Sequence, residues 1–287
     1  MNNIEIIIPT YNAGKKFNEL AGILKQQKNI TPNNIRIIDS SSTDDTVHIA
    51  KQAGFHVQII KKEEFGHGRT RNMAATQSQA DYLVFLTQDA IPAAPDAIWK
   101  LCLPLIENPS IGLTYGRQLP VSGIGILGNH ARLFNYPAQS LLKTKRDIPR
   151  LGVKTIFCSD SFAAYNRKKL LESGNFPDVD FGEDTLIAAK FIKEGYAVYY
   201  NADACVYHAH SFTLSEDFQR SVIIGKLHHD NQPVFDSFGA VNGEGVKFVK
   251  SELYTLISHK CIKLLPVACF HNLVKFLGYR LGKSNIL

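Results

Sequence analysis

The stretch that decides the fold is YLVFLTQDA, residues 82–90, in which an apolar run stops abruptly at Thr87-Gln88-Asp89. A short run of aromatic and branched residues followed by a polar turn is typical of a buried strand. Runs of the same kind occur at IEIII (4–8), IRIID (35–39) and HVQII (56–60). The feature to explain is the single carboxylate, Asp89, on which a buried strand ends.

Helical patterns separate these strands, at residues 15–27, 44–53 and 68–79. Strands that alternate with helices predict a parallel sheet with right-handed crossovers, and ligands bind beyond the carboxyl ends of such strands. Four polar loops follow the predicted strands and are expected on one edge of the sheet: PTYN (9–12), DSSS (39–42), FGHGRTRN (65–72) and TQDA (87–90).

The second half of the chain is less regular. The segment 118–152 is broken by Gly and Pro, and such a length in a compact domain indicates a functional lid or substrate loop. The run 154–167 is predicted to be a strand that enters a turn, 183–195 an amphipathic helix, and 196–210 extended. From about residue 246 the tail is helical and basic, with no acidic side chain after Glu252.

Composition bounds the class of protein. The 287 residues are 45% hydrophobic and 20% charged, with a formal net charge of +6, which suits phosphate-bearing ligands or an anionic surface. The modest charge and the absence of a recognition motif argue against a nucleic-acid binder. The five cysteines form no CxxC pair, so buried reduced thiols and a cytoplasmic protein are expected. No signal sequence and no membrane-spanning segment are recognised.

Several side chains at the strand ends are candidates for ligand binding. Asp39 ends a strand, where a carboxylate can accept hydrogen bonds from a base or ribose. Arg71 and Asn72 follow two glycines near a helix start, a place that attracts phosphate. Taken singly, each has an ordinary alternative as a turn or surface residue.

A metal site is the second candidate. His208 and His210 alternate on an extended segment and point to one face, so with Asp89 they offer ligands for Mn²⁺ or Mg²⁺ once a diphosphate adds oxygens. The alternative is a structural cap and one buried histidine. Glu183 and Asp184 begin a helix, where acids either complement the dipole or present a general base, and the pattern does not separate these.

Taken in order, PTYN, DSSSTDDT, FGHGRTRN, FLTQDA, GEDT and VYHAH resemble the inverting glycosyltransferase family 2. Within this family the chain is most similar to the bacterial rhamnosyltransferase branch, and the similarity runs from about residue 4 to 255. The motifs that carry it are DSSSTDDT, EEFGHGRTRN, FLTQDAIP, YGRQLP and GEDTLIAAK. The resemblance implies a GT-A fold of class α/β, a mostly parallel Rossmann-like nucleotide-binding sheet fused to a smaller acceptor-binding part. Residues 1–245 would form this domain, with a nucleotide-sugar-binding half (1–117) and an acceptor and catalytic half (118–245). A basic amphipathic helical tail (246–287) would follow the domain.

The resemblance also implies roles for single residues. Asp184 matches the catalytic base and Asp89 the final, metal-binding aspartate of a DxD motif, whose first acid is replaced by Thr87. His208 would join Asp89 on Mn²⁺ or Mg²⁺. Donor binding would fall to Thr10, Tyr11, Asn12, Asp39, Arg71, Asn72, Gln88 and His210. Acceptor contacts are expected from Arg132, Phe134, Tyr136, Glu183 and Asp160, the last at the end of an IFCS strand.

By the same resemblance the donor is dTDP-β-L-rhamnose and the acceptor a glycan, free or linked to polyprenyl diphosphate. The basic tail is expected at the inner membrane leaflet, with packing on the core or on a partner chain as the alternative. A homo-oligomer is left open. The rival functions are a UDP-hexose donor with the same fold and a silent GT-A domain that only binds carbohydrate.

Overall fold

The structure, a computed structural model, describes residues 3–209, 213–239 and 243–284. The chain forms two compact units that interleave in sequence: residues 1–118, 138–146 and 155–208 in the first, and residues 119–137, 147–154 and 209–287 in the second. These units do not follow the predicted contiguous halves, and the functional meaning given to residues 1–117, 118–245 and 246–287 stays a prediction. Each unit is described by itself.

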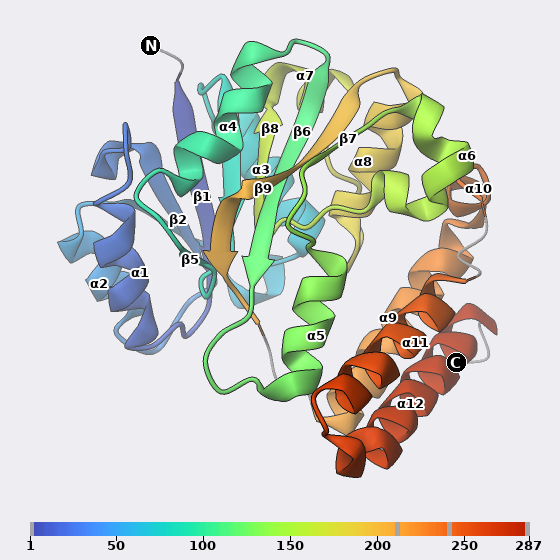
Figure 1. The fold of residues 1–287 in the computed structure, drawn as a ribbon. Helices are drawn as coiled ribbons and strands as arrows, with labels where there is room; N and C mark the ends of the chain where they lie inside the picture. The colour runs from blue at the N-terminus through green and yellow to red at the C-terminus, as the bar shows by residue number, and fades with distance from the viewer. Residues whose placement is uncertain (1–2, 210–212, 240–242, 285–287) are drawn as a thin grey trace. The chain divides into compact units, whose positions relative to one another are not determined.

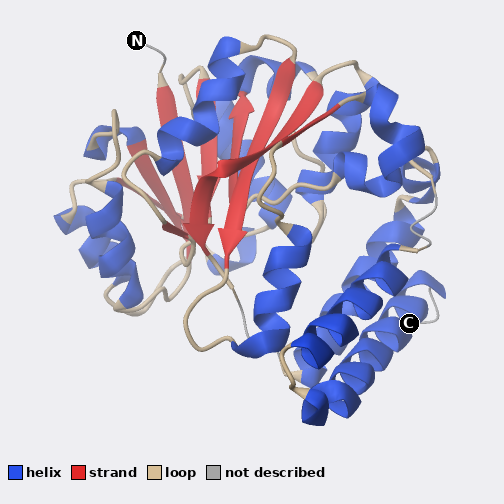
Figure 2. Cartoon of the chain, viewed as in Figure 1, coloured by secondary structure: helices blue, strands red, loops and turns tan. Residues whose placement is uncertain are grey.

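The first unit is built on one nine-stranded sheet, shown in red in Figure 2. Its strands are β1 Ile4–Thr10, β2 Ile35–Asp39, β3 His56–Ile59, β4 Tyr82–Leu86, β5 Ile91–Pro92, β6 Ile111–Leu119, β7 Leu141–Lys143, β8 Phe162–Asn166 and β9 Ala197–Tyr207. Its order is β3-β2-β1-β4-β8-β6-β9-β5, and β7 also pairs with β9.

The parallel pairing predicted from the alternating pattern holds for β3, β2, β1 and β4. In register, Thr10 pairs with Asp39, and Asp39 with Ile59, so the loops after β1, β2 and β3 leave one edge together. Beyond β4 the sheet turns antiparallel, because β8 runs against both β4 and β6. The predicted α/β class is confirmed, while the parallel part is limited to these four strands.

Helices cover both faces of this sheet (Figure 2). The helices of the first unit are α1 Lys16–Leu24, α2 Thr46–Gln52, α3 His67–Gln77, α4 Ala97–Glu107, α7 Arg167–Glu172 and α8 Glu183–Lys193, and the short 3₁₀ helices are η1 Pro32–Asn34 and η2 Lys62–Glu64. Alternate residues of β1, such as Ile6 and Ile8, pack with Leu20 of α1 and Leu101 of α4. Phe85 of β4 belongs instead to an aromatic group with Tyr165 and Phe176.

The second unit is helical. Its helices are α5 Gly125–Asn135, α6 Ile148–Leu151, α9 Leu214–Asp230, α10 Gln232–Asp236, α11 Glu244–Ser258 and α12 Leu265–Ser284; η5 is Ile262–Leu264, and η3 Lys145–Asp147 and η4 Gly152–Ile156 cross the unit boundaries. The helices α9, α11 and α12 lie side by side, orange to red in Figure 1. Within the described ranges no helix has the length and apolar character needed to cross a membrane.

Two expectations about the second half are wrong. The stretch 118–152 is not an unstructured loop, because α5, β7 and α6 lie in it. Gly123 and Gly125 adopt φ of 84° and 75° at the start of α5, so these glycines begin a helix where the sequence suggested a break. The IFCS stretch is not a strand either: Ile156 ends η4, and Asp160 precedes β8.

Candidate active site

Polar groups at the carboxyl ends of β1 and β2 are joined by hydrogen bonds. Asp39 is fully buried and accepts hydrogen bonds from Thr10 Oγ1 at 2.8 Å, Ser42 N at 2.8 Å and Ser42 Oγ at 2.6 Å. Asn12, at φ 45°, accepts from Thr43 N at 2.8 Å. With its oxygens engaged, Asp39 shapes the two loops in this structure, and direct contact with a nucleoside stays a prediction.

Tyr11 is the exposed member of this edge. Its backbone N–H donates to Gln88 Oε1 at 2.8 Å and its carbonyl accepts from Gln88 Nε2 at 3.2 Å, so the PTYN and TQDA loops are tied together as expected. Lys62 lies beside the ring, with Nζ 3.0 Å from the Tyr11 hydroxyl and 4.7 Å from the ring centroid. An aromatic face with a neighbouring ammonium suits a nucleoside and its phosphates. Sequence reasoning missed Lys62, which sits in a charged KKEE stretch without any signal.

Asp89 and His208 meet as predicted. His208 is buried, and its Nε2 lies 3.4 Å from Asp89 Oδ1. On the other side of the ring, Nδ1 lies 2.9 Å from Gln118 Oε1. Because an amide oxygen only accepts, Nδ1 carries the proton in this contact and Nε2 is the nitrogen turned toward Asp89.

This donor set fits a divalent cation. The imidazole nitrogen of His208 and a carboxylate oxygen of Asp89 face one another. The Gln118 amide oxygen accepts from the other ring nitrogen and fixes the tautomer, as is usual for metal-bound histidine. Gln118 in turn donates from Nε2 to Ser159 Oγ at 3.1 Å. Among the described residues no group of three or more His, Cys, Asp or Glu side chains forms a metal cluster, so other ligands would come from diphosphate and water. His210 lies outside the described residues.

A second cluster surrounds Arg71, which is 4% exposed. Its Nε lies 3.1 Å from Asp160 Oδ2, and Nη1 donates to Glu183 Oε1. Asp160 also accepts from the Tyr165 hydroxyl at 2.6 Å. Burial opposes the charge of Arg71, but the surrounding carboxylates outweigh burial and raise the pKa of the guanidinium.

Four residues with predicted ligand contacts instead have their polar groups engaged within the protein in this structure. Arg71 is expected at the donor, but its guanidinium is buried and paired with carboxylates. Asp160 and Glu183 are expected at the acceptor, yet they are 2% and 4% exposed and serve as partners of Arg71. Asn72 likewise bonds the Phe176 backbone, donating to its carbonyl at 2.7 Å and accepting from its N–H at 2.8 Å.

Asp184 is the partly exposed carboxylate of this cluster. Its Oδ1 accepts from Thr185 N at 2.6 Å and its Oδ2 from Asp160 N at 3.3 Å, so the start of α8 and the loop before β8 aim the carboxylate. Burial raises the pKa of the Asp184 carboxyl to about 6, with Glu183 adding to the rise and Arg71 opposing it. A carboxylate with this pKa is suited to take a proton near neutral pH.

The predicted acceptor residues of α5 and its end belong to the second unit. Phe134 packs with its ring centroid 5.2 Å from that of Phe248 and 5.8 Å from that of His130, and Lys154 lies over its ring. Tyr136 is 4% exposed, whereas Arg132 is partly exposed. Phe134 thus packs within its unit, and the acceptor role of all three residues stays a prediction.

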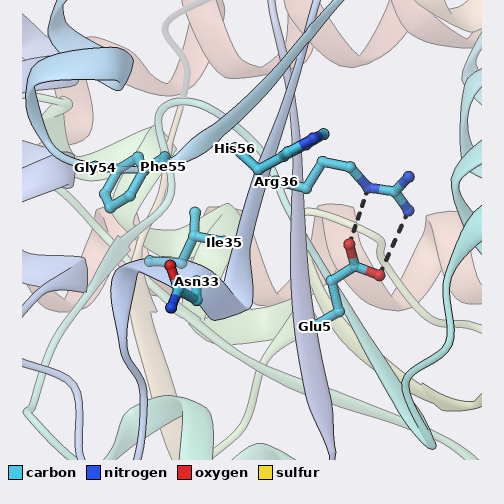
Figure 3. A pocket seen from close by; sticks show the side chains of 7 residues that line it. All are labelled: Glu5, Asn33, Ile35, Arg36, Gly54, Phe55 and His56. Carbon is cyan, nitrogen blue, oxygen red and sulfur yellow. Dashed lines mark hydrogen bonds and ion pairs between the residues drawn. The ribbon is translucent and has the colours of Figure 1, made fainter.

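A pocket at the other edge of the sheet is distinct from this site (Figure 3). It is lined by residues at the amino-terminal ends of β1, β2 and β3, including Glu5, Arg36 and His56. Arg36 Nε lies 3.0 Å from Glu5 Oε1, and Nη2 donates to the Ala74 carbonyl at 2.7 Å. Ligands of parallel sheets bind at the opposite, carboxyl ends, so this pocket is not the donor site.

The family description "Glycosyl transferase family 2" matches residues 5–174. The chain is 42% identical over 286 residues to the O-antigen chain rhamnosyltransferase WbaN of Salmonella anatum, covering 99% of this chain and 90% of that protein. It is 43% identical over 283 residues to RfbN, of the same description, from Salmonella typhimurium, covering 98% and 89%.

Solved structures of other proteins share the fold of this chain. The mannosyltransferase PcManGT from Pyrobaculum calidifontis, in complex with GDP-Man and Mn²⁺, superposes with a TM-score of 0.61 at 17% identity over 98% of this chain and 83% of that one. Residues 1–349 of Staphylococcus aureus TarS superpose with a TM-score of 0.55 at 17% identity, over 98% and 90%. The chain belongs to glycosyl transferase family 2. It is a glycosyltransferase of GT-A fold, as the resemblance predicted.

Proposed function

We propose that the protein transfers L-rhamnose from dTDP-β-L-rhamnose, with inversion, to a hydroxyl of a lipid-linked glycan in bacterial surface polysaccharide synthesis. The donor proposal is supported by the near full-length similarity to two O-antigen chain rhamnosyltransferases. The observation that carries the mechanism is Asp184, the partly exposed carboxylate of a cluster whose other acids are buried.

In this proposal Asp184 takes the proton of the acceptor hydroxyl. That oxygen attacks the anomeric carbon from the face opposite dTDP, the bond from this carbon to the diphosphate oxygen breaks, and dTDP leaves with the electron pair. A β-linked donor gives an α-linked rhamnoside in one displacement. Holding donor and acceptor in line contributes much of the reduction in barrier.

Asp89 and His208 would hold Mg²⁺ or Mn²⁺, which when bound neutralises charge on the diphosphate. Tyr11 would offer its ring to the nucleoside, with Lys62 beside it. Thr10, Asn12, Asp39 and Gln88 would keep the three loops after β1, β2 and β4 in place through the hydrogen bonds described above. Arg71 would hold the carboxylate cluster together and act as a positioning residue.

The test is nucleotide release by the purified protein, offered dTDP-rhamnose or UDP-hexoses in parallel, with Mn²⁺ or with chelator. The proposal predicts that the protein releases dTDP from dTDP-rhamnose, and that this release stops when chelator is added. Release from a UDP-hexose alone would overturn the rhamnose assignment while keeping the enzyme class.

Replacement of the base separates transfer from mere binding. Asp184→Asn should keep donor affinity, measured by calorimetry, and lose transfer by a factor on the order of 10²–10⁴, the usual contribution of a general base. Unchanged transfer by Asp184→Asn would exclude this residue as the base. Donor binding without turnover in the unaltered protein, with a lipid-linked glycan acceptor present, would favour a silent carbohydrate-binding domain.

A further inference from the structure

The face of α12 that packs on the rest of its unit is made of small and polar residues. Gly278 and Gly282 are buried against α9, so closely that a Cβ on Gly282 would lie 2.0 Å from the Val222 carbonyl oxygen. On the same side Asn272 donates to Glu252 at 2.6 Å, and Lys275 Nζ lies 3.4 Å from Asp217 Oδ2. Close backbone approach, polar pairs and the ring of Tyr279, which lies 5.5 Å from that of His228 in α9, hold this helix on its unit.

The opposite face of α12 is apolar and exposed. It consists of Val267, Phe270, Leu273, Phe276 and Leu277, each between 43% and 58% exposed. Their spacing of three and four residues places them on one side of a helix. A helix that packs on a protein core normally turns this side inward, so the orientation of α12 is the reverse of the usual one. Contiguous exposed apolar side chains mark an interaction surface.

The charged side chains of α12 itself, and of the segment just before it, are all basic. Lys260 and Lys263 are exposed before α12, and Arg280 and Lys283 are exposed in its last turns. No acidic residue follows Glu252, which is itself buried. Two copies of such a face would bring like charges together. A layer of anionic headgroups over an acyl interior matches both the basic ends and the apolar middle.

We propose that the outward face of α12, defined as Val267, Phe270, Leu273, Phe276 and Leu277, binds an anionic phospholipid surface. The helix lies in the plane of the headgroups with its phenylalanines among the acyl chains. The basic residues at its two ends reach the headgroups, since long cationic side chains extend toward polar surroundings while their stems stay apolar. The inference is independent of the donor and of the chemistry proposed above.

The experiment is co-sedimentation of the full chain with vesicles of phosphatidylethanolamine and phosphatidylglycerol, compared with phosphatidylcholine vesicles, without sugar nucleotide. We expect binding to the anionic vesicles that added salt weakens. Phe270→Gln with Phe276→Gln should weaken it by about 100-fold, because each buried phenylalanine contributes on the order of tenfold. Ile223→Gln with Val246→Gln, which changes two exposed apolar residues outside the face, is the matched control and should bind as the unaltered protein does.

Thermal melting of both double variants checks that they fold. Equal vesicle binding by the folded Phe270/Phe276 variant and the unaltered protein would overturn the proposal. A second result would also overturn it: the unaltered protein does not bind vesicles and is a dimer in light scattering, whereas the Phe270/Phe276 variant is a monomer. The face would then join two copies of the chain. Because no donor is present, neither result bears on the sugar-transfer proposal.

Discussion

Asp184 shows how local backbone and buried charge set the chemistry of one residue. The N–H groups of Thr185 and Asp160 hold its two oxygens, and burial works against its charge. The same helix start also supplies Glu183, which points to Arg71 and is closed off from solvent. Two neighbouring acids therefore have different surroundings, and this difference favours Asp184 over Glu183 as the proposed general base.

The first prediction concerns pH. A general base works when ionised, and the pKa of Asp184 is raised to about 6, so kcat/KM should rise with pH through about 6 and fall about tenfold per unit below it. The measurement is transfer at saturating metal over a pH series. An acidic limb near the ordinary aspartate value of about 4 would contradict the effect of burial.

The second prediction concerns Gln118, whose Oε1 lies 2.9 Å from His208 Nδ1. Gln118→Leu removes the amide oxygen that fixes the tautomer of His208. It should weaken Mn²⁺ binding by about 10–100-fold, the usual effect of losing the hydrogen-bond partner of a metal-binding histidine. Titration of Mn²⁺ followed by electron paramagnetic resonance measures it without turnover. Gln118→Glu keeps an acceptor oxygen and should restore most of the affinity; equal loss in both variants would argue against the positioning role.

At the scale of elements, the second unit depends on how closely α9 and α12 approach. The buried glycines of α12 face the backbone of α9, whereas Gly245 of α11 has open space around its Cβ position. The glycines of these two helices thus differ in what a methyl group would meet, although nothing in their local sequence separates them.

The third prediction follows from this difference. Gly282→Ala should lower the free energy of unfolding by about 1–3 kcal/mol, because the added methyl meets the Val222 carbonyl and the helices must separate. Gly245→Ala is the matched control and should be neutral or stabilising by about 0.4–1 kcal/mol. Urea unfolding compares them, and equal stability of the two variants would show that α9 and α12 move apart without cost.

At the scale of the molecule, the first unit gathers its candidate ligands from loops that are distant in sequence. The loops after β1, β2 and β4 join through Thr10–Asp39 and Tyr11–Gln88, and the end of β9 brings His208 to Asp89. A ligand that bridges these loops stabilises the folded unit by mass action.

The fourth prediction is that dTDP with Mn²⁺, at about 100 times its Kd, raises the stability of the protein by about 2.7 kcal/mol. Differential scanning fluorimetry should register a rise of several degrees that chelator reverses. Asp89→Asn should lose the metal-dependent part of the shift. A shift that is the same with Mn²⁺ and with chelator would contradict the assignment of Asp89 and His208 to the metal.

Much of the first unit could be predicted from local pattern. The strands at 4–8, 35–39, 56–60 and 82–86 were expected from short branched runs and correspond to β1–β4. The runs of β1, β2 and β4 are largely buried, whereas the edge strand β3 exposes His56 and Ile59 and was found from its branched residues alone. The antiparallel strands and α5 were harder, since the IFCS run before β8 resembles a strand and is not one, and the glycines of α5 resemble breaks. The meeting of Asp89 and His208 was one of two alternatives that the residue types left open, and the family resemblance favoured it.

The sequence by itself determined the alternating strands and helices, the polar loops at the strand ends and the family motifs, because these depend on neighbours along the chain. Three features depend on the folded chain: Arg71 pairs with Asp160 and Glu183, Gln118 orients His208, and α12 turns its apolar face outward. Each of these depends on residues far apart in sequence. Whether a charged side chain reaches a ligand or a buried partner, and which side of a helix is covered, is fixed by packing and has no local signal.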